Sequence, residues 1–221
     1  MIDTELRYQQ ILLTITQYQN GDVSNSMIKH GLNYKTNYGV SIPIIDKIAE
    51  KYPLDSELAV YLWNQDERES KLLALRLFNN KLDNELITKM VIDGIENSEL
   101  AEQASQYYFI RLENSTKIAL DLIKNTNEYC NLAGLILISK LAQNDKNLGN
   151  ETFSQFIDEL KNLKLCHSFH QKRGLARALL QIGLRNTDLK HHIINWIDIY
   201  SIENSEYKNW IEQEVKYYLT N

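Results

Sequence analysis

The stretch YGVSIPIIDKIAEKYPLDSELAVYLWNQDERESKLLALRLF, residues 38–78, decides the fold of this chain. It holds both prolines and the starts of three helices in close succession. Ser41 stands just before Ile42 and Pro43, and a proline in the first helical turn removes no hydrogen bond. Asp55 follows Pro53 and caps a second amphipathic run. Residues 38–78 therefore predict helices, not strands.

The third helix of this stretch begins directly after the second. Asp66 stands three residues before Glu69, and such a pair resembles a capping box, in which each side chain satisfies a free backbone amide. A helix that ends near Trp63 thus turns at once into another helix. Two helices joined this tightly pack antiparallel, so we expect a helical hairpin here.

The same pattern recurs along the chain. A first set of helices begins with a polar cap and an apolar face near Leu54, Leu82, Asn114, Asn150 and Asn186, and a second set begins near Asp66, Asn97, Asn127, Ser168 and Asn204. Five hairpins spaced by about 30 to 36 residues are typical of two-helix solenoids. We therefore predict an all-α fold, a HEAT-like or armadillo-type superhelix of antiparallel hairpins, forming a single domain over residues 1–221.

Composition narrows the class of protein further. The chain has 43% hydrophobic and 24% charged residues, as soluble globular proteins do. Its longest apolar run, residues 132–138, is too short to span a membrane. Two cysteines without a secretion signal favour a reduced, cytoplasmic protein with no disulfide framework. We expect a monomer that has no membrane association and needs no cofactor.

Positive charge gathers in one part of this acidic chain, whose net charge is −5. Between residues 161 and 192 stand seven cations and one acid, Asp188; the cations are Lys161, Lys164, Lys172, Arg173, Arg177, Arg185 and Lys190. Lys172, Arg173 and Arg177 can share one side of a helix. This pattern predicts a surface that binds nucleic-acid phosphates. The alternative is a solvated face that balances acidic helices.

A smaller basic cluster, with Lys29 and Lys35, lies before the Pro43 helix and is a second candidate for nucleic-acid contact. Four of the five histidines lie in or beside the larger basic region, near Cys166. They are His167, His170, His191 and His192. Their spacing matches no zinc pattern and no carboxylate stands beside them, so we predict no metal site. Phosphate-binding glycine loops and nucleophile elbows are also absent from the sequence.

Aromatic residues mark one of the helices of the second set. Tyr107, Tyr108 and Phe109 follow one another and span about 200° of a helix, so part of the run is core and one ring can face a groove. Tyr107 and Tyr108 are therefore candidates for stacking on a base. Glu102 is a carboxylate about one turn earlier and a weak catalytic candidate, although a glutamate on a helix surface is usually only solvated.

The stretch around these first helices resembles the N-terminal part of the AlkD-type DNA alkylation repair proteins. The shared features are a helix start at Gly39-Val40 and Pro43, a Leu-Trp turn that leads to Arg-Glu, and an alanine-rich helix; here the turn and helix hold Leu62, Trp63, Arg68, Glu69 and Ala74. The later hairpins follow in compatible order through about residue 183. The resemblance implies a HEAT-like superhelix with a concave basic face for duplex DNA, alkylated or not.

Active members of that family remove cationic alkylated purines by hydrolysing the N-glycosidic bond. The resemblance implies a carboxylate near the deoxyribose and aromatic rings beside the lesion. In this sequence Leu100, Ala101 and Ala104 stand where the tryptophan and aspartate of active relatives would fall. Asn131 or Leu132 replaces an arginine, and Ala176 corresponds to a second tryptophan.

These departures leave three readings of the function. The first is a DNA-binding member of the family without glycosylase activity. The second is a 3-methyladenine or 7-methylguanine glycosylase with a rearranged site. The third is a helical scaffold for a protein partner, because a fold does not fix a function.

Overall fold

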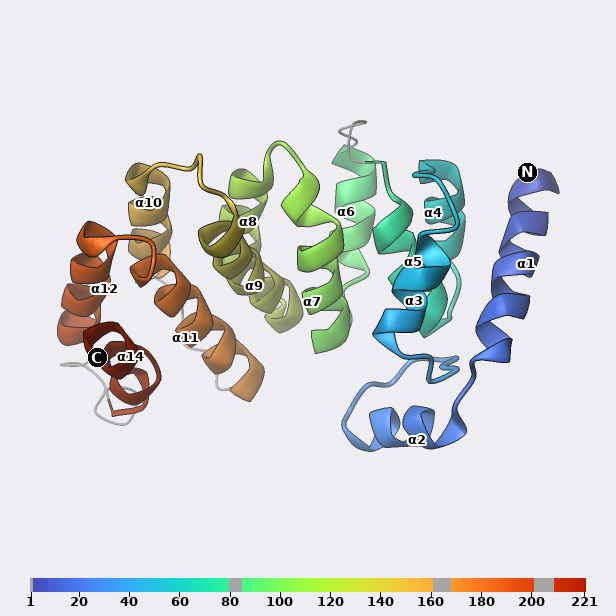
Figure 1. Cartoon of the computed structure of the whole chain (residues 1–221), viewed down its shortest axis with the longest axis horizontal. Helices are drawn as coiled ribbons and strands as arrows, with labels where there is room; N and C mark the ends of the chain where they lie inside the picture. The colour runs from blue at the N-terminus through green and yellow to red at the C-terminus, as the bar shows by residue number, and fades with distance from the viewer. Residues whose placement is uncertain (1, 80–84, 161–167, 201–208) are drawn as a thin grey trace. The chain divides into compact units, whose positions relative to one another are not determined.

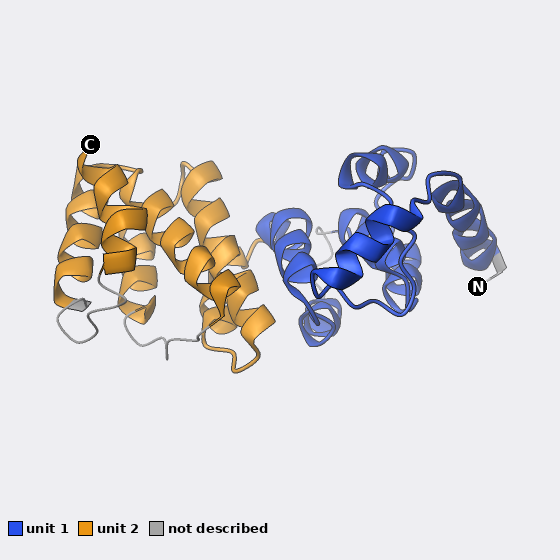
Figure 2. Cartoon of the chain, turned by 90° about the horizontal axis from the view of Figure 1, so that it is seen from below, with its two compact units in different colours: residues 1–112 blue, residues 113–221 orange. Residues whose placement is uncertain are grey.

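A computed structural model of the chain describes residues 2–79, 85–160, 168–200 and 209–221. Within these ranges the regular elements are helical, and the sole strand-like feature is an isolated bridge between Thr36 and Glu67. The all-α prediction is confirmed. Figure 2 marks two compact units, residues 1–112 and 113–221. The single domain predicted over residues 1–221 stays a prediction.

The first unit consists of seven α-helices and a short 3₁₀ helix within its described residues, and Figure 1 labels the α-helices. They are α1 (Ile2–Gln17), α2 (Gly21–Lys29), α3 (Ile42–Ala49), α4 (Ser56–Trp63), α5 (Arg68–Leu77), α6 (Glu85–Asp93), α7 (Ser98–Tyr107) and η1 (Phe109–Arg111). Helix α5 packs against α4, its partner in the hairpin, and also against α3 and α7. This central helix is buried on most sides.

The second unit continues the alternation of helices. It contains α8 (Ser115–Ile123), α9 (Glu128–Asn144), α10 (Asn150–Leu160), α11 (Phe169–Gly183), α12 (Thr187–Tyr200), the π-helical segment η2 (Glu212–Lys216) and α14 (Tyr217–Thr220). Helix α9 packs along both α8 and α11. The predicted start of the last helix, at Asn204, lies outside the described residues.

Two helices of the second set carry a glycine where they pack against a neighbouring helix, and a residue without a Cβ atom lets the two helices approach closely. A Cβ atom added at Gly134 of α9 would lie 2.7 Å from the backbone nitrogen of Ile123 in α8. One added at Gly174 of α11 would lie 3.0 Å from Leu132 in α9. These two glycines hold the three helices α8, α9 and α11 in contact.

Several helix starts agree with the sequence. Asp55 caps α4, because its side chain accepts hydrogen bonds from the backbone amides of residues 57 and 58. Helix α3 begins at Ile42 with Pro43 in its first turn, although Ser41 makes no side-chain cap bond. The capping box predicted for Asp66 and Glu69 is wrong, because Glu67 is the N-cap of α5 and Glu69 turns into the protein.

Candidate nucleic-acid interface

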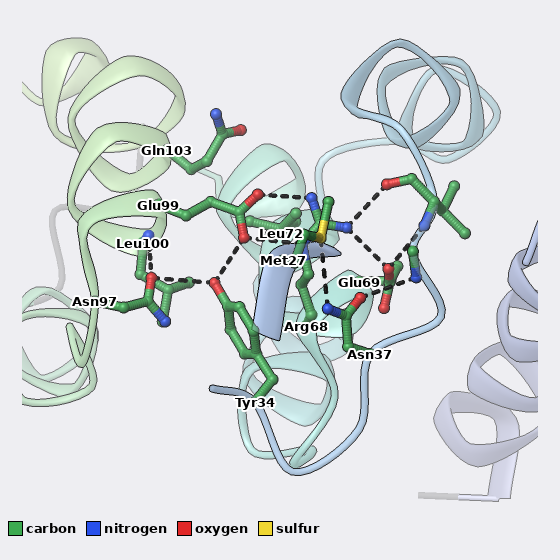
Figure 3. A network of polar contacts seen from close by, with 12 residues as sticks. Met27, Tyr34, Asn37, Arg68, Glu69, Leu72, Asn97, Glu99, Leu100 and Gln103 are labelled. Carbon is green, nitrogen blue, oxygen red and sulfur yellow. Dashed lines mark hydrogen bonds and ion pairs between the residues drawn. The ribbon is translucent and has the colours of Figure 1, made fainter. Parts of the chain in front are cut away.

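The side chain of Glu69 belongs to a buried polar network that fixes the loop between α2 and α3 (Figure 3). The Glu69 carboxylate accepts hydrogen bonds from the backbone amides of Tyr38 and Val40, each at 3.1 Å. Arg68 lies beside it, only 1% exposed, and donates one Nη1 bond to the Val40 carbonyl and another to Glu69. The loop is thus held through its main chain.

Arg68 also reaches the first turn of α7. Its Nε and Nη2 donate to the two carboxylate oxygens of Glu99 at 2.8 and 2.6 Å, a bidentate pair. Burial by itself lowers the pKa of Arg68, but the bonds and charges of Glu99 and Glu69 outweigh it and hold that pKa above its ordinary value. Burial and the Glu99 carboxylate also raise the pKa of Tyr34, so its phenol stays protonated and donates to Glu99.

This network joins the loop to α5 and α7 and consists of groups that satisfy one another. It has the form of a structural clasp, because each charge in it has partners within the first unit. Arg68 and Glu69 are among the residues on which the family resemblance rests, so part of that resemblance describes how the loop is held.

Two exposed arginines of the second unit lie close together on α11. Arg173 and Arg177 are exposed and stand one turn apart, and Lys172 is half-buried beside them. Neither arginine forms an ion pair with a carboxylate in the described part of the chain. On its opposite side α11 buries Gln171, whose amide donates to Asn131 of α9 at 3.0 Å. This bond fixes which side of α11 faces the solvent.

One residue on the exposed side was not predicted from the sequence. Phe169, the first residue of α11, is 65% exposed, the highest fraction of any large apolar side chain described in the second unit. The Arg173 guanidinium lies 5.6 Å from its ring centroid, and the His170 ring stands edge-on at 6.1 Å. The signal in the sequence was an aromatic residue one helical turn before an arginine of the basic region.

Other members of the predicted basic region have different positions. Arg185 is a structural residue, because it donates to the carbonyls of Ala142, Asp145 and Leu148 and lies over the Phe153 ring. Counting it as surface charge was wrong. Four further members of the region, namely Lys161, Lys164, Cys166 and His167, lie outside the described residues.

The smaller basic cluster belongs to the first unit. Lys29, the last residue of α2, is exposed. Lys35 is exposed but paired with Asp66 at 2.6 Å, and this bond raises the pKa of Lys35. The two predicted basic clusters therefore belong to different units. Lys172, Arg173 and Arg177 lie in the second unit, and Lys29 and Lys35 lie in the first.

The aromatic candidates on α7 differ from one another. Tyr107 is half-buried; its hydroxyl donates to Asp46 at 3.3 Å, and the Arg76 guanidinium lies 3.6 Å from its ring centroid. Tyr108 is only 3% exposed and packs against two phenylalanines, so its proposed stacking on a base is wrong. Glu102 is exposed and has no hydrogen bond or ion pair with the described residues.

The positions where active relatives would have catalytic groups are inside the two units. Ala101 and Ala104 have no exposed surface, and Ala176 is buried as well. Asn131 is buried and donates to the Ile123 carbonyl while it accepts from Gln171. None of these positions presents a carboxylate, an arginine or a tryptophan to a ligand. Glu102 remains the exposed carboxylate nearest to them on α7.

The described residues contain neither a metal-binding cluster nor a membrane-spanning helix. Histidine, cysteine, aspartate and glutamate side chains form no group of three or more that could hold a metal ion in those residues. The helices described in the structure include none long and apolar enough to cross a membrane.

Comparisons with known proteins agree with this fold. A family model described as "DNA alkylation repair enzyme" matches residues 11–209. One solved structure is similar with a TM-score of 0.76 and 16% identity over 86% of this chain and 81% of the other. It is described as "a new family of proteins related to the HEAT-like repeat DNA glycosylases with affinity for branched DNA structures". This similarity confirms the HEAT-like fold. A comparison with curated proteins found no match.

Proposed function

Because this chain belongs to the DNA alkylation repair enzyme family, we propose that it binds DNA through the charged side of α11 and does not excise bases. The observation that supports DNA binding is the pair of exposed arginines one turn apart, Arg173 and Arg177, in a chain with a net charge of −5. Exposed cations grouped in an acidic protein attract a polyanion locally. Arginine is also suited to phosphate, because its planar group can donate two parallel bonds.

The kind of DNA that the chain binds is the next part of the proposal. Phosphate contacts position a protein on DNA without reading its sequence, so we expect little sequence preference. The similar solved protein is described as having affinity for branched DNA, and we extend this to the present chain as part of the proposal. Duplex and branched DNA, alkylated or not, are therefore the expected partners.

The absence of base excision is proposed from the interior of α7, α9 and α11. Hydrolysis of the N-glycosidic bond needs a group that stabilises positive charge on the sugar, such as a carboxylate near it. Ala101, Ala104, Asn131 and Ala176 occupy the positions where the family resemblance places such groups or their aromatic partners, and all four are buried. A substrate cannot meet them without unpacking the helices.

Salt-dependent binding tests the first part of the proposal. Fluorescence anisotropy with a labelled duplex and a labelled four-way junction gives the affinity at salt concentrations from 50 to 200 mM. We expect binding to weaken steeply with salt, and Arg173→Ala/Arg177→Ala to reduce the slope of log K against log[salt] by about 1.8, about 0.9 for each phosphate that the variant no longer neutralises. Over this range the slope change equals about a 12-fold difference in affinity.

Lys117→Ala/Lys146→Ala is the matched control, because both lysines are exposed in the same unit and the double variant loses the same charge. It should leave the slope within the error of the wild type. Equal slopes for the two double variants would remove α11 from the interface. Binding that ignores salt, or no binding at 50 mM, would refute the DNA-binding proposal and favour the scaffold reading.

Release of free base tests the second part. Methylated DNA is incubated with excess protein, and 3-methyladenine and 7-methylguanine are measured by chromatography and mass spectrometry. We expect no release above the spontaneous rate. Release that depends on Glu102, measured with Glu102→Gln, would instead establish a glycosylase with a rearranged site.

A further inference from the structure

We propose that Phe169 is a stacking platform for an unpaired nucleotide, so that the exposed side of α11 distinguishes DNA that has unpaired bases from continuous duplex. This inference rests on the proposed function, because it requires that α11 meets DNA. The proposed function covers only phosphate contacts. This inference adds contact with the face of an unstacked base, which phosphate contacts alone do not distinguish.

The exposure of Phe169 is the first observation. A phenylalanine is usually buried, and a ring that is 65% exposed at the start of a helix keeps a large apolar surface in water. The orientation is fixed by its neighbours along the chain. The Ser168 hydroxyl caps α11 by accepting from the amide of Gln171, and the Gln171 side chain is bonded into α9. Phe169 is therefore held on the opposite side of the helix, toward solvent.

The second observation is the charge that accompanies the ring. Residues 169, 173 and 177 are four apart, so successive side chains are separated by about 40° around α11 and about 6 Å along it. Arg173 lies next to the ring, at 5.6 Å, and Arg177 continues the line. An aromatic ring followed by two exposed cations offers a surface for one base and for the phosphates beside it.

This combination favours an unpaired nucleotide over the other partners. In a continuous duplex the faces of the bases are covered by their neighbours, so an exposed ring gains nothing there. At a gap, a bulge or a branch point a base can leave the stack. Stacking on an aromatic side chain contributes about 1–3 kcal/mol per base and does not depend on the base's identity. The cations make an apolar protein helix a poorer occupant than a polyanion.

Two DNAs with the same number of base pairs test the inference. One is a continuous 30-base-pair duplex, and the other has a three-nucleotide bulge with 2-aminopurine at its centre. Phe169→Leu keeps apolar volume but removes the ring, and Phe169→Trp keeps a ring. We expect Phe169→Leu to weaken binding of the bulged DNA about 5- to 150-fold, the change that corresponds to loss of one stacked base. Binding of the continuous duplex should change less than twofold.

The fluorescence of 2-aminopurine gives a direct reading of stacking. Wild-type protein and Phe169→Trp should quench it on binding, whereas Phe169→Leu at saturating protein should not. Thermal unfolding of the variants should match the wild type, because the ring is exposed.

The inference and the proposed function fail in different ways. If Arg173→Ala/Arg177→Ala weakens binding of both DNAs while Phe169→Leu affects neither, or both equally, the stacking platform is refuted and DNA binding by α11 stands. If the arginine variant also changes neither DNA, the proposed function is refuted as well.

Discussion

Replacing Arg68 by methionine tests the buried clasp of the first unit, because methionine keeps a similar length and removes the guanidinium. The variant loses the bidentate pair with Glu99, the bond to Glu69 and the bond to the Val40 carbonyl. Glu69 keeps its two backbone donors, and Glu99 keeps the Tyr34 hydroxyl. Two carboxylates then face each other across the site without the cation that compensates them.

The expected cost follows from burial. Removing one partner of a buried ion pair destabilises a protein by about 3–5 kcal/mol, because the remaining charge is left without compensation. Arg68 is 1% exposed, so solvent screens little of this cost. Unfolding free energies of domains are about 5–15 kcal/mol, and 1 kcal/mol shifts the Tm of a unit of about 100 residues by about 4 °C or more. We therefore expect the Tm of the first unit to fall by on the order of 15 °C.

Urea unfolding followed by circular dichroism measures the free energy, and hydrogen exchange with mass spectrometry locates the effect. Faster exchange should be concentrated in residues 32–40, the loop that the clasp holds. Lys35→Met is the matched control, since both partners of its ion pair with Asp66 are exposed and solvent screens their attraction.

A compensated variant separates charge from packing. Arg68→Met/Glu69→Gln/Glu99→Gln removes all three charges and keeps amide oxygens as acceptors for the loop, so it should recover a large part of the lost stability. If Arg68→Met costs no more than Lys35→Met, or if exchange rises outside residues 32–40 instead, the reasoning about the clasp is refuted.

Three further predictions concern other parts of the fold. Burial would raise the pKa of Asp55, but the bond from Arg7 and the cap amides hold that pKa below its ordinary value. The Asp55 carboxylate therefore contributes stability above about pH 3.9, and this contribution is lost as the pH falls through the lower pKa of the folded state. In urea midpoints measured from pH 3 to 7, Asp55→Asn should lose less stability below pH 4 than the wild type does. Gly39→Ala should destabilise the protein more than Gly31→Ala. Both substitutions place a side chain at a positive φ, which costs about 1–3 kcal/mol, but only at Gly39 would the added Cβ atom also clash with neighbouring backbone. Equal urea midpoints for the two variants would contradict this. Asn131→Leu should cost about 1–3 kcal/mol for each buried polar partner it leaves unbonded, and a change under 0.5 kcal/mol in the same assay would show that water replaces it.

The features predicted from the sequence are those set by near neighbours in the chain. The helix caps and the apolar faces depend on residues within one or two helical turns of each other. The cap at Asp55 and the succession of hairpins were predicted for this reason. The exposed positions of Arg173 and Arg177 also follow from helical periodicity, since residues four apart share a side.

The features that were missed depend on partners distant in the sequence. Glu69 looked like a local cap, but its partners are backbone amides 29 and 31 residues away. Arg185 looked like surface charge, but its partners are carbonyls about 40 residues away at the end of α9 and in the loop that follows it. Periodicity cannot predict such pairings, because they form only when separate helices have packed. The exposure of Phe169 was missed for a related reason, since an aromatic residue at a helix start is equally compatible with a buried position.

The clasp has a consequence for how the loop can vary and be used. Glu69 and Arg68 hold residues 38–40 by amides and a carbonyl, which every residue except proline offers in the same way. The course of residues 38–40 therefore depends little on their side chains, except at Gly39, where the positive φ and the neighbouring backbone require glycine. Asn33 is an exposed residue of the same loop, outside residues 38–40, and is therefore a suitable place to attach a fluorophore that reports on events near α2.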